Sequence, residues 1–371
     1  MNKNSEYLKV FSECLPVRGY RRALIYDLAR NDKRFIPLGL YDILQNFTNK
    51  SLTSLINSFP DEQEIIKEYL SFLQKHDYIF YCDSNELDLF NSMKLDWQEP
   101  ALLSTGIIEI HNINLDYYNQ IFNFLLAAGC KQLVFYLDDS INVSLIKSLL
   151  SLLEASRIQS IDIVMSSSSS NLDDFNQLAA VKRLNKILIT QATENNYNLA
   201  TKQLRLKDDF RFEKFRTSEN SFIINLSFFT ESRSHNSYFN QKIFFAKNGD
   251  IKNSFETSTV FANVNKIKSY EALKTLVSSS EFQKQWHYNK DKCDVCKECE
   301  FRYMCLDNRE LNERVDGSLY HKEECNYNPF ICKWEGEEGY LNLEQCGVIS
   351  NDSGCSIDND KIDTINSKLW K

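Results

Sequence analysis

The chain has 371 residues, of which 43% are hydrophobic and 13% aromatic, and it carries a formal net charge of −8 at pH 7. With only 10 glycines and 5 prolines it is neither collagen-like nor of low complexity, and its length predicts two or three domains. The negative charge argues against general nucleic-acid binding, which needs a basic face.

Residues 1–95 predict a small α+β module, because short β-prone runs precede three stretches with apolar residues at helical spacing. The expected elements are strands at residues 20–27, 33–37 and 78–81 and helices at residues 38–47, 51–59 and 61–75. Ser51 is the expected N-cap of the second helix. This order of strands and helices is typical of a winged-helix-like domain.

Residues 96–235 predict strands that alternate with helices, the pattern of βαβ units in a parallel sheet. The expected strands span residues 103–110, 132–137, 160–165 and 186–190, with a further one at 222–229, and the expected helices span residues 117–128, 143–155 and 173–181. Gly129 stands where a left-handed helix C-cap is expected. Such a set of strands forms either a partial barrel or an open sheet.

Regular periodicity fades in residues 236–371. Asn248-Gly249 predicts a hairpin between residues 242–245 and 251–253, and residues 278–286 predict a helix that leads into a group of cysteines. The remaining loop-rich sequence is of a kind that commonly depends on metal for order.

Four cysteines fall within thirteen residues and two more follow: Cys293, Cys296, Cys299, Cys305, Cys325 and Cys332. Thiolates at two-residue spacing can bind one ion or cluster, because a tight turn presents both sulfurs on one side. Spacing alone does not separate zinc from iron–sulfur. His287 and His321 flank this region and are candidates for outer-shell groups.

The N-terminal residues lack the apolar segment of a secretory signal, and no apolar run reaches the length of a membrane span. A cytoplasmic location is therefore expected, with no membrane partner, and disulfides are not expected there. Three isolated cysteines with apolar neighbours are predicted to be core residues, and two near the end to be ordinary loop residues: Cys14, Cys82 and Cys130, then Cys346 and Cys355.

The spacing Cys296-x2-Cys299-x5-Cys305, with Cys325 beyond it, resembles the second half of a SPASM domain. This is the auxiliary iron–sulfur domain of many peptide-modifying radical S-adenosylmethionine enzymes. The run Cys-Glu-Phe-Arg-Tyr-Met-Cys-Leu-Asp that begins at Cys299 is similar to one branch, the grasp-with-spasm peptide maturases. Their genes lie beside an ATP-grasp ligase and a short precursor peptide. The runs that begin at Phe11 and Ile36 also resemble this family.

The resemblance implies one [4Fe–4S] cluster bound by Cys296, Cys299, Cys305 and Cys325, with Cys293 and Cys332 as alternates for the fourth ligand. Zinc is the alternative metal. Two positions that would serve a second cluster hold Ser254 and Arg309, so a second cluster is not expected.

The radical motif Cys-x3-Cys-x2-Cys does not occur, since only three widely separated cysteines precede Cys293. S-adenosylmethionine is therefore not expected, and the middle region is predicted to be a degenerate partial (β/α) barrel. Whether any catalysis remains is left open, because the sequence contains no evident nucleophile–base arrangement. Asp138-Asp139 at a strand end is interpreted as a solvated turn, and the serines at 166–170 as a linker.

The resemblance implies a multi-domain α/β accessory protein for maturing a ribosomally made peptide. Residues 1–95 would recognise the leader of the precursor by strand addition, residues 96–235 form the partial barrel, and residues 236–371 form the SPASM-like iron–sulfur domain. The expected partners are the precursor and an ATP-grasp ligase. Basic residues in the first module favour an acidic leader: Arg18, Arg21, Arg22, Arg30, Lys33 and Arg34.

Two alternatives stay open. The chain is either a redox or peptide-modifying enzyme that uses the cluster, or a zinc-stapled protein-interaction module. The sequence specifies neither the precursor, nor the bond formed, nor the oligomeric state.

Overall fold

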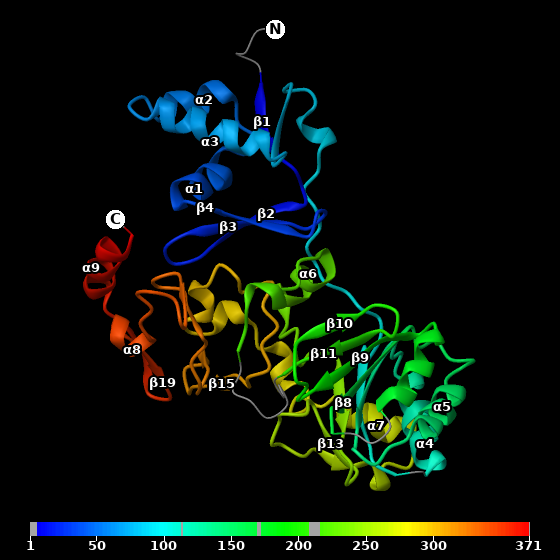
Figure 1. Cartoon of the computed structure of the whole chain (residues 1–371). Helices are drawn as coiled ribbons and strands as arrows, with labels where there is room; N and C mark the ends of the chain where they lie inside the picture. Colours follow the sequence, from blue (N-terminus) through cyan, green and yellow to red (C-terminus); the bar gives the residue numbers. More distant parts are fainter. Residues whose placement is uncertain (1–5, 113, 169–171, 208–215, 371) are drawn as a thin grey trace.

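The computed structural model describes residues 6–112, 114–168, 172–207 and 216–370 (Figure 1). In these ranges the chain is a mixed α/β protein whose largest sheet has nine strands, in the order β10-β11-β9-β8-β7-β6-β12-β13-β14. The six strands from β11 to β12 run parallel, which confirms the predicted α/β class. None of the described helices is both long and apolar enough to cross a bilayer.

The N-terminal module has a three-stranded antiparallel sheet followed by three helices. Its elements are β1 (Tyr7–Val10), β2 (Cys14–Arg18), β3 (Ala23–Asp27), β4 (Asp32–Ile36), α1 (Leu38–Phe47), α2 (Leu52–Ser58), α3 (Gln63–Lys75) and β5 (Ile79–Cys82). The sheet order is β2-β3-β4, while β1 pairs with β5. The three helices lie within two residues of their predicted bounds, and the Ser51 hydroxyl caps α2 by accepting from Ser54 N–H at 3.2 Å. The predicted strand at 20–27 is wrong in its first half, because residues 19–22 form the turn that joins β2 to β3.

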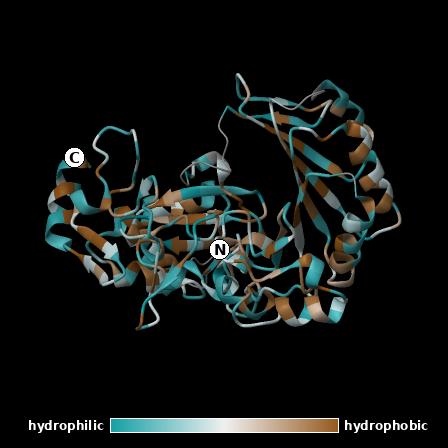
Figure 2. Cartoon of the chain, turned by 90° about the horizontal axis from the view of Figure 1, so that it is seen from below, coloured by the Kyte–Doolittle hydropathy of each residue, from teal (hydrophilic) through white to brown (hydrophobic). Residues whose placement is uncertain are grey.

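The large sheet carries apolar side chains on the face that its helices cover. Its parallel strands are β6 (Thr105–Ile110), β7 (Gln132–Leu137), β8 (Ser160–Ser166), β9 (Leu184–Thr190), β11 (Gln203–Arg205) and β12 (Lys242–Phe245), and its covering helices are α4 (Leu115–Ala127) and α5 (Val143–Leu152). Ile108, Phe135 and Ile163 are paired positions on the neighbouring strands β6, β7 and β8, and they share one apolar cluster with Phe122 and Leu125 of α4. Figure 2 shows the hydrophobic residues along these strands and flanking helices.

Gly129 follows α4 with φ +89°, as the predicted left-handed cap requires. A Cβ atom at this position would lie only 2.9 Å from the Cβ of Ala101. Close packing against Ala101 therefore also requires a residue without a side chain here. The helix predicted at 173–181 is present as a 3₁₀ helix, Leu172–Ala180.

The predicted hairpin at Asn248-Gly249 is confirmed as β12 and β13 (Asp250–Lys252), with Gly249 at φ +84°. Together with β14 (Ala262–Asn263), these strands extend the central sheet well past residue 235. At the opposite end, β10 (Asn196–Asn198) pairs with β11.

Two predicted elements between residues 222 and 286 are wrong. The expected strand at 222–229 is instead an irregular segment, 222–225, followed by the start of α6 (Leu226–Ser234), because Asn225 accepts from Phe228 N–H at 2.9 Å and caps a helix. Short apolar runs do not distinguish strand from helix by pattern alone. The segment 278–286, expected to be one helix, is a turn that leads into a 3₁₀ helix at Lys284–His287. The regular helix of this region is α7 (Tyr270–Val277), which Ser269 caps.

The rest of the chain is rich in loops, as predicted, and its sheets have two strands each. The elements are β15 (Asn312–Glu313), β16 (Leu319–Tyr320), β17 (Tyr327–Asn328), β18 (Lys333–Trp334), α8 (Leu343–Cys346), β19 (Val348–Asn351), β20 (Gly354–Ile357) and α9 (Asn359–Leu369). A small cluster of Phe330, Leu343, Val348 and Ile362 is its separate core.

A further apolar cluster joins the first sheet to the cysteine region. Leu24 and Tyr26 of β3 share it with Phe229 of α6 and with Phe301 and Met304 from the cysteine loop. The N-terminal module therefore packs against the C-terminal region (Figure 1).

Candidate metal centre

The four predicted cluster ligands come together in the fold. Cys296, Cys299, Cys305 and Cys325 line one cavity of about 40 Å³, which also has Lys290 and Arg309 in its wall. A four-iron cluster is larger than this space, so loading would require the surrounding side chains to move apart. The donor set suits such a cluster, and the four-thiolate set stays a prediction.

A second set of donors is more tightly grouped. The ligand atoms of Cys293, Cys296 and His321 all lie within 4.8 Å of one another. Cys293, predicted as an alternate ligand, thus lies beside Cys296, whereas Cys332 points its thiol at the Pro329 carbonyl at 3.6 Å and does not line the cavity. His321 was expected only as an outer-shell group, and 25 residues separate it from Cys296.

A tight turn brings Cys293 and Cys296 together. Val295 between them adopts φ +66°, an unusual conformation for a β-branched residue. The Lys297 N–H donates to the Cys293 carbonyl at 2.9 Å and the Cys299 N–H to the Cys296 carbonyl at 3.0 Å, so the loop turns twice in succession.

Buried charges surround the sulfurs. A hydrogen bond from Cys293 lowers the pKa of Cys296, and His321 and Arg309 act in the same direction against the effect of burial. Burial raises the pKa of Cys325 to about 12. The Lys290 ammonium donates to the Cys305 carbonyl, and Arg309 pairs with Asp307 at 2.6 Å. Of the six cysteines of this region, Cys296 is the one whose pKa is lowered.

The residue after Cys299 ties this loop to the first sheet. Glu300 is fully buried, and its carboxylate accepts from Arg22 Nε at 2.6 Å and from the Tyr327 hydroxyl at 2.7 Å. The Tyr26 hydroxyl donates to the Glu300 carbonyl at 2.7 Å. The turn before β3 adds a backbone bond from Tyr20 N–H to the Glu298 carbonyl at 2.7 Å. Arg22 was predicted only as part of a basic surface, and its ion pair spans 278 residues.

The three cysteines predicted as core residues are buried, whereas the prediction of Cys346 and Cys355 as loop residues is wrong, because they lie in a helix and a strand. Cys14, Cys82 and Cys130 are buried in apolar surroundings, and burial raises the pKa of Cys14 to about 12. Cys346 is buried at the end of α8 and Cys355 is exposed on β20. Ser254, at a position that would serve a second cluster, is buried and lies 3.0 Å from the Thr257 hydroxyl.

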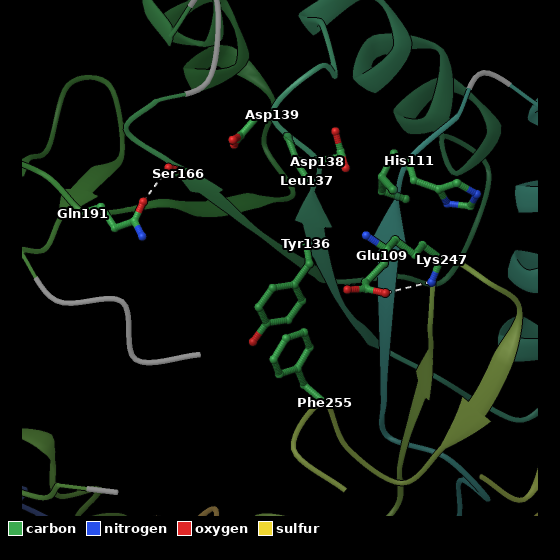
Figure 3. Close-up of a pocket in the computed structure, with 11 residues that line it drawn as sticks. Glu109, His111, Tyr136, Leu137, Asp138, Asp139, Ser166, Gln191, Lys247 and Phe255 are labelled. Carbon is green, nitrogen blue, oxygen red and sulfur yellow. Dashed lines mark hydrogen bonds between the residues drawn. The ribbon is translucent and has the colours of Figure 1, made fainter. Parts of the chain in front are cut away.

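A separate polar cavity of about 350 Å³ lies at the carboxyl ends of the parallel strands (Figure 3). Glu109 and His111 reach it from β6, and Asp138 and Asp139 follow β7. Its sides are tied together by the Lys247 N–H, which donates to the Glu109 carboxylate at 2.7 Å. Ligands of open α/β sheets bind at this edge. Asp138 is exposed and accepts from Ser140 N–H at 3.2 Å, which agrees with the predicted turn.

No protein-family model and no curated protein matches the chain. Among solved structures, the crystal structure of Streptococcus suis SuiB bound to S-adenosylmethionine aligns with 81% of this chain and 94% of its own, at 11% identity and a TM-score of 0.33. A second crystal structure of Streptococcus suis SuiB aligns over 80% and 94%, at 10% identity and a TM-score of 0.36. TM-scores this low do not define a common fold.

Proposed function

We propose that the protein is an accessory maturation protein that binds the leader of a precursor peptide as an added strand on β4. The observation that carries this proposal is the edge of β4, which pairs with no strand in the described part of the chain and contacts the cysteine loop through Phe35 and Phe301. Strand addition gives affinity through main-chain hydrogen bonds and register through side-chain pockets.

The pairing register shows which groups of β4 are free. The Gly19 N–H donates to the Arg22 carbonyl, and the Leu28 N–H donates to the Glu13 carbonyl. In the register of β2 and β3, these bonds mean that the main-chain N–H and C=O groups of Leu24 and Tyr26 point toward β2. The main-chain groups of the alternate residues of β3, Ala23, Ile25 and Asp27, therefore point toward β4. On β4 this leaves the N–H and C=O groups of Lys33 and Phe35 pointing outward, and no strand of the described ranges pairs with them.

The other edge of this sheet is closed. Pro16 of β2 has no N–H to offer, the Cys14 N–H donates to the Phe11 carbonyl at 2.9 Å, and the Arg18 carbonyl accepts from Arg302 at 2.6 Å. Proline on an edge strand is a common means of preventing further pairing. An incoming strand is therefore directed to β4.

Aromatic side chains flank the open edge. The ring of Phe35 is 39% exposed and packs edge-to-face with Phe301 at 5.8 Å, and the Lys33 ammonium lies 5.7 Å from the Phe222 ring. A peptide added to β4 would thus lie beside the segment that follows Cys299. This placement would bring the precursor peptide next to the cysteine loop.

The structure argues against recognition by charge. Five of the six basic residues that were expected to favour an acidic leader pair with carboxylates, in the ion pairs Arg18–Asp42, Arg22–Glu300, Arg30–Asp27, Lys33–Glu219 and Arg34–Asp32. Arg21 instead stacks on Trp370 at 5.0 Å. The preference for an acidic leader is accordingly not retained, and leader affinity should change little between low and high ionic strength.

Replacing Phe35 by proline should weaken leader binding about tenfold or more, because it removes an outward N–H and places a ring on the pairing edge. Phe35→Ala is the matched control, since it loses the same aromatic ring but keeps the N–H. Titration of the full chain with fluorescent peptides encoded beside its gene measures both affinities. Equal binding by the wild type and the proline variant would contradict strand addition at β4.

Two finer expectations come from the resemblance and stay predictions: an ATP-grasp ligase as partner, and a [4Fe–4S] cluster on Cys296, Cys299, Cys305 and Cys325. Co-purification with the neighbouring ligase tests the first. Mass spectrometry of the precursor after anaerobic incubation with the protein and a reductant separates the accessory role from the enzyme alternative, because only an enzyme would change the peptide mass without the ligase.

A further inference from the structure

We propose that Cys293, Cys296 and His321 bind a single Zn²⁺ ion whose fourth coordination position opens into a neighbouring cavity. This inference stands on the cysteine loop alone and does not depend on peptide binding. It differs from the four-thiolate set in its ligands, its metal and its open position.

The donor geometry is close to what zinc needs. Tetrahedral zinc with bonds of about 2.0–2.3 Å places its donor atoms about 3.5–3.8 Å apart. The three donors here are all within 4.8 Å of one another, so small side-chain rotations bring them into range. Two thiolates and one imidazole are a common zinc donor set.

His321 is prepared as a ligand through its second nitrogen. Its Nδ1 lies 3.3 Å from the Glu310 carbonyl, and a bond donated there fixes the tautomer with a lone pair on Nε2. The side chain is only 7% exposed, and Nε2 makes no hydrogen bond within the described part of the chain. Nε2 also lies 3.5 Å from an Asp307 carboxylate oxygen. A lone pair facing a carboxylate is unfavourable unless a positive charge, either a proton on Nε2 or a metal ion, lies between them.

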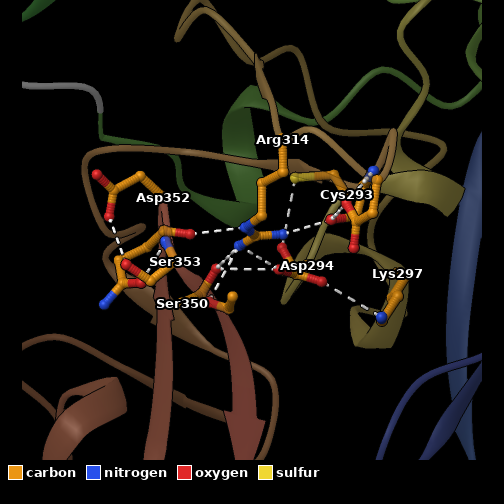
Figure 4. A network of polar contacts seen from close by, with 11 residues as sticks. Cys293, Asp294, Lys297, Arg314, Ser350, Asp352 and Ser353 are labelled. Atoms are coloured by element: carbon orange, nitrogen blue, oxygen red, sulfur yellow. Dashed lines mark hydrogen bonds and ion pairs between the residues drawn. The ribbon is translucent and has the colours of Figure 1, made fainter.

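The turn that joins the two cysteines is held by a buried ion pair (Figure 4). Asp294 pairs with Arg314 at 2.7 Å, with side chains 4% and 6% exposed, and it accepts from the Ser350 hydroxyl at 3.2 Å. Arg314 also donates to the Asn351 carbonyl at 2.7 Å, which anchors the hairpin of β19 and β20 to the turn. Positive φ at the β-branched Val295 is strained and persists only where the surroundings enforce it. Strain of this kind is concentrated at functional sites.

The fourth position faces an accessible space. A cavity of about 320 Å³ is lined by Cys296, His321, Arg309 and Cys325. Zinc sites with three protein ligands and one open position are of the catalytic type, whereas structural sites use four protein ligands. The open position would take water or an anionic donor such as a thiolate or a carboxylate.

The single-ion set is proposed in place of the [4Fe–4S] cluster that the resemblance implies, because both sets use Cys296 and cannot be filled together. Metal analysis of selected variants therefore decides between them. Anaerobically purified full chain should contain one zinc per chain, and Co²⁺ substitution should give the visible absorption of a tetrahedral site with two thiolates.

His321→Ala and Cys293→Ser should each lower zinc affinity by more than about 100-fold. Loss of an outer-shell partner costs up to about 100-fold, and loss of a direct ligand should cost more. Cys299→Ser and Cys305→Ser, on the same loop, are matched controls that should retain zinc. His321→Cys should also retain it, which separates ligand loss from misfolding. The proposal would be overturned if the chain contained four irons with sulfide. It would also be overturned if the Cys299 and Cys305 variants lost zinc while His321→Ala retained it. Retention of the cobalt spectrum in Cys325→Ser is expected, because that thiol is not a ligand.

Discussion

Replacing Arg22 by methionine should destabilise the folded chain by about 3–5 kcal/mol, the cost of leaving a buried charge without its partner. Glu300 is fully buried and its second carboxylate oxygen already makes no hydrogen bond within the described residues. Without Arg22, that carboxylate would keep only the Tyr327 hydroxyl as a neutral donor. Urea denaturation followed by tryptophan fluorescence measures the loss.

Arg21→Met provides the comparison for this variant. Arg21 is the neighbouring arginine, but it stacks on Trp370 instead of forming a buried ion pair, so its loss should cost about 1 kcal/mol or less. Removing both charges in Arg22→Met/Glu300→Leu should recover much of the stability, because no unpaired charge remains. A loss below about 1 kcal/mol in Arg22→Met would show that the ion pair does not hold the first sheet on the cysteine loop.

Cys296→Ser should abolish metal binding whichever ligand set is filled, because this residue belongs to both. Metal binding and local folding are coupled in such loops, so the segment around residues 293–325 should also lose order. We expect the disturbance to reach the first sheet, since Tyr20 bonds to the Glu298 carbonyl and Arg22 to Glu300. Elemental analysis and hydrogen exchange of these amides measure the two effects.

Cys355→Ser is the control for general effects of removing a thiol. Cys355 is exposed on β20 and lies in neither ligand set, so this variant should keep its metal and its exchange pattern. Full metal content in Cys296→Ser would place the metal elsewhere. Metal loss without faster exchange at Tyr20 would show that the loop holds its shape unaided.

Local pattern was sufficient for much of the fold. The bounds of α1 and β7 match their predictions, because apolar periodicity and length both favoured one element. The pattern failed at α6, where a short aromatic run is compatible with strand or helix and the Asn225 cap decides. It also gave no sign that β12 returns to pair with β6, because that contact joins residues more than 130 positions apart.

The same limit applies to the candidate site. Close spacing revealed the cysteines, since several thiols in one short loop are typical of metal binding. His321 gave no comparable signal, because its proximity to Cys296 depends on the loop that includes β15 and β16. Glu300 follows a predicted ligand in the chain, and only the packing of β3 on this loop makes it a buried partner of Arg22.

The open edge of β4 has a second consequence, for the behaviour of the chain in concentrated solution. Two copies that present the same bare strand can pair with each other, which is a common first step of self-association. Asp32, Lys33 and Arg34 place three consecutive charges on this strand, and charged edges oppose such pairing. A bound peptide would occupy the outward main-chain groups of β4, so the peptide would also keep the protein from self-associating.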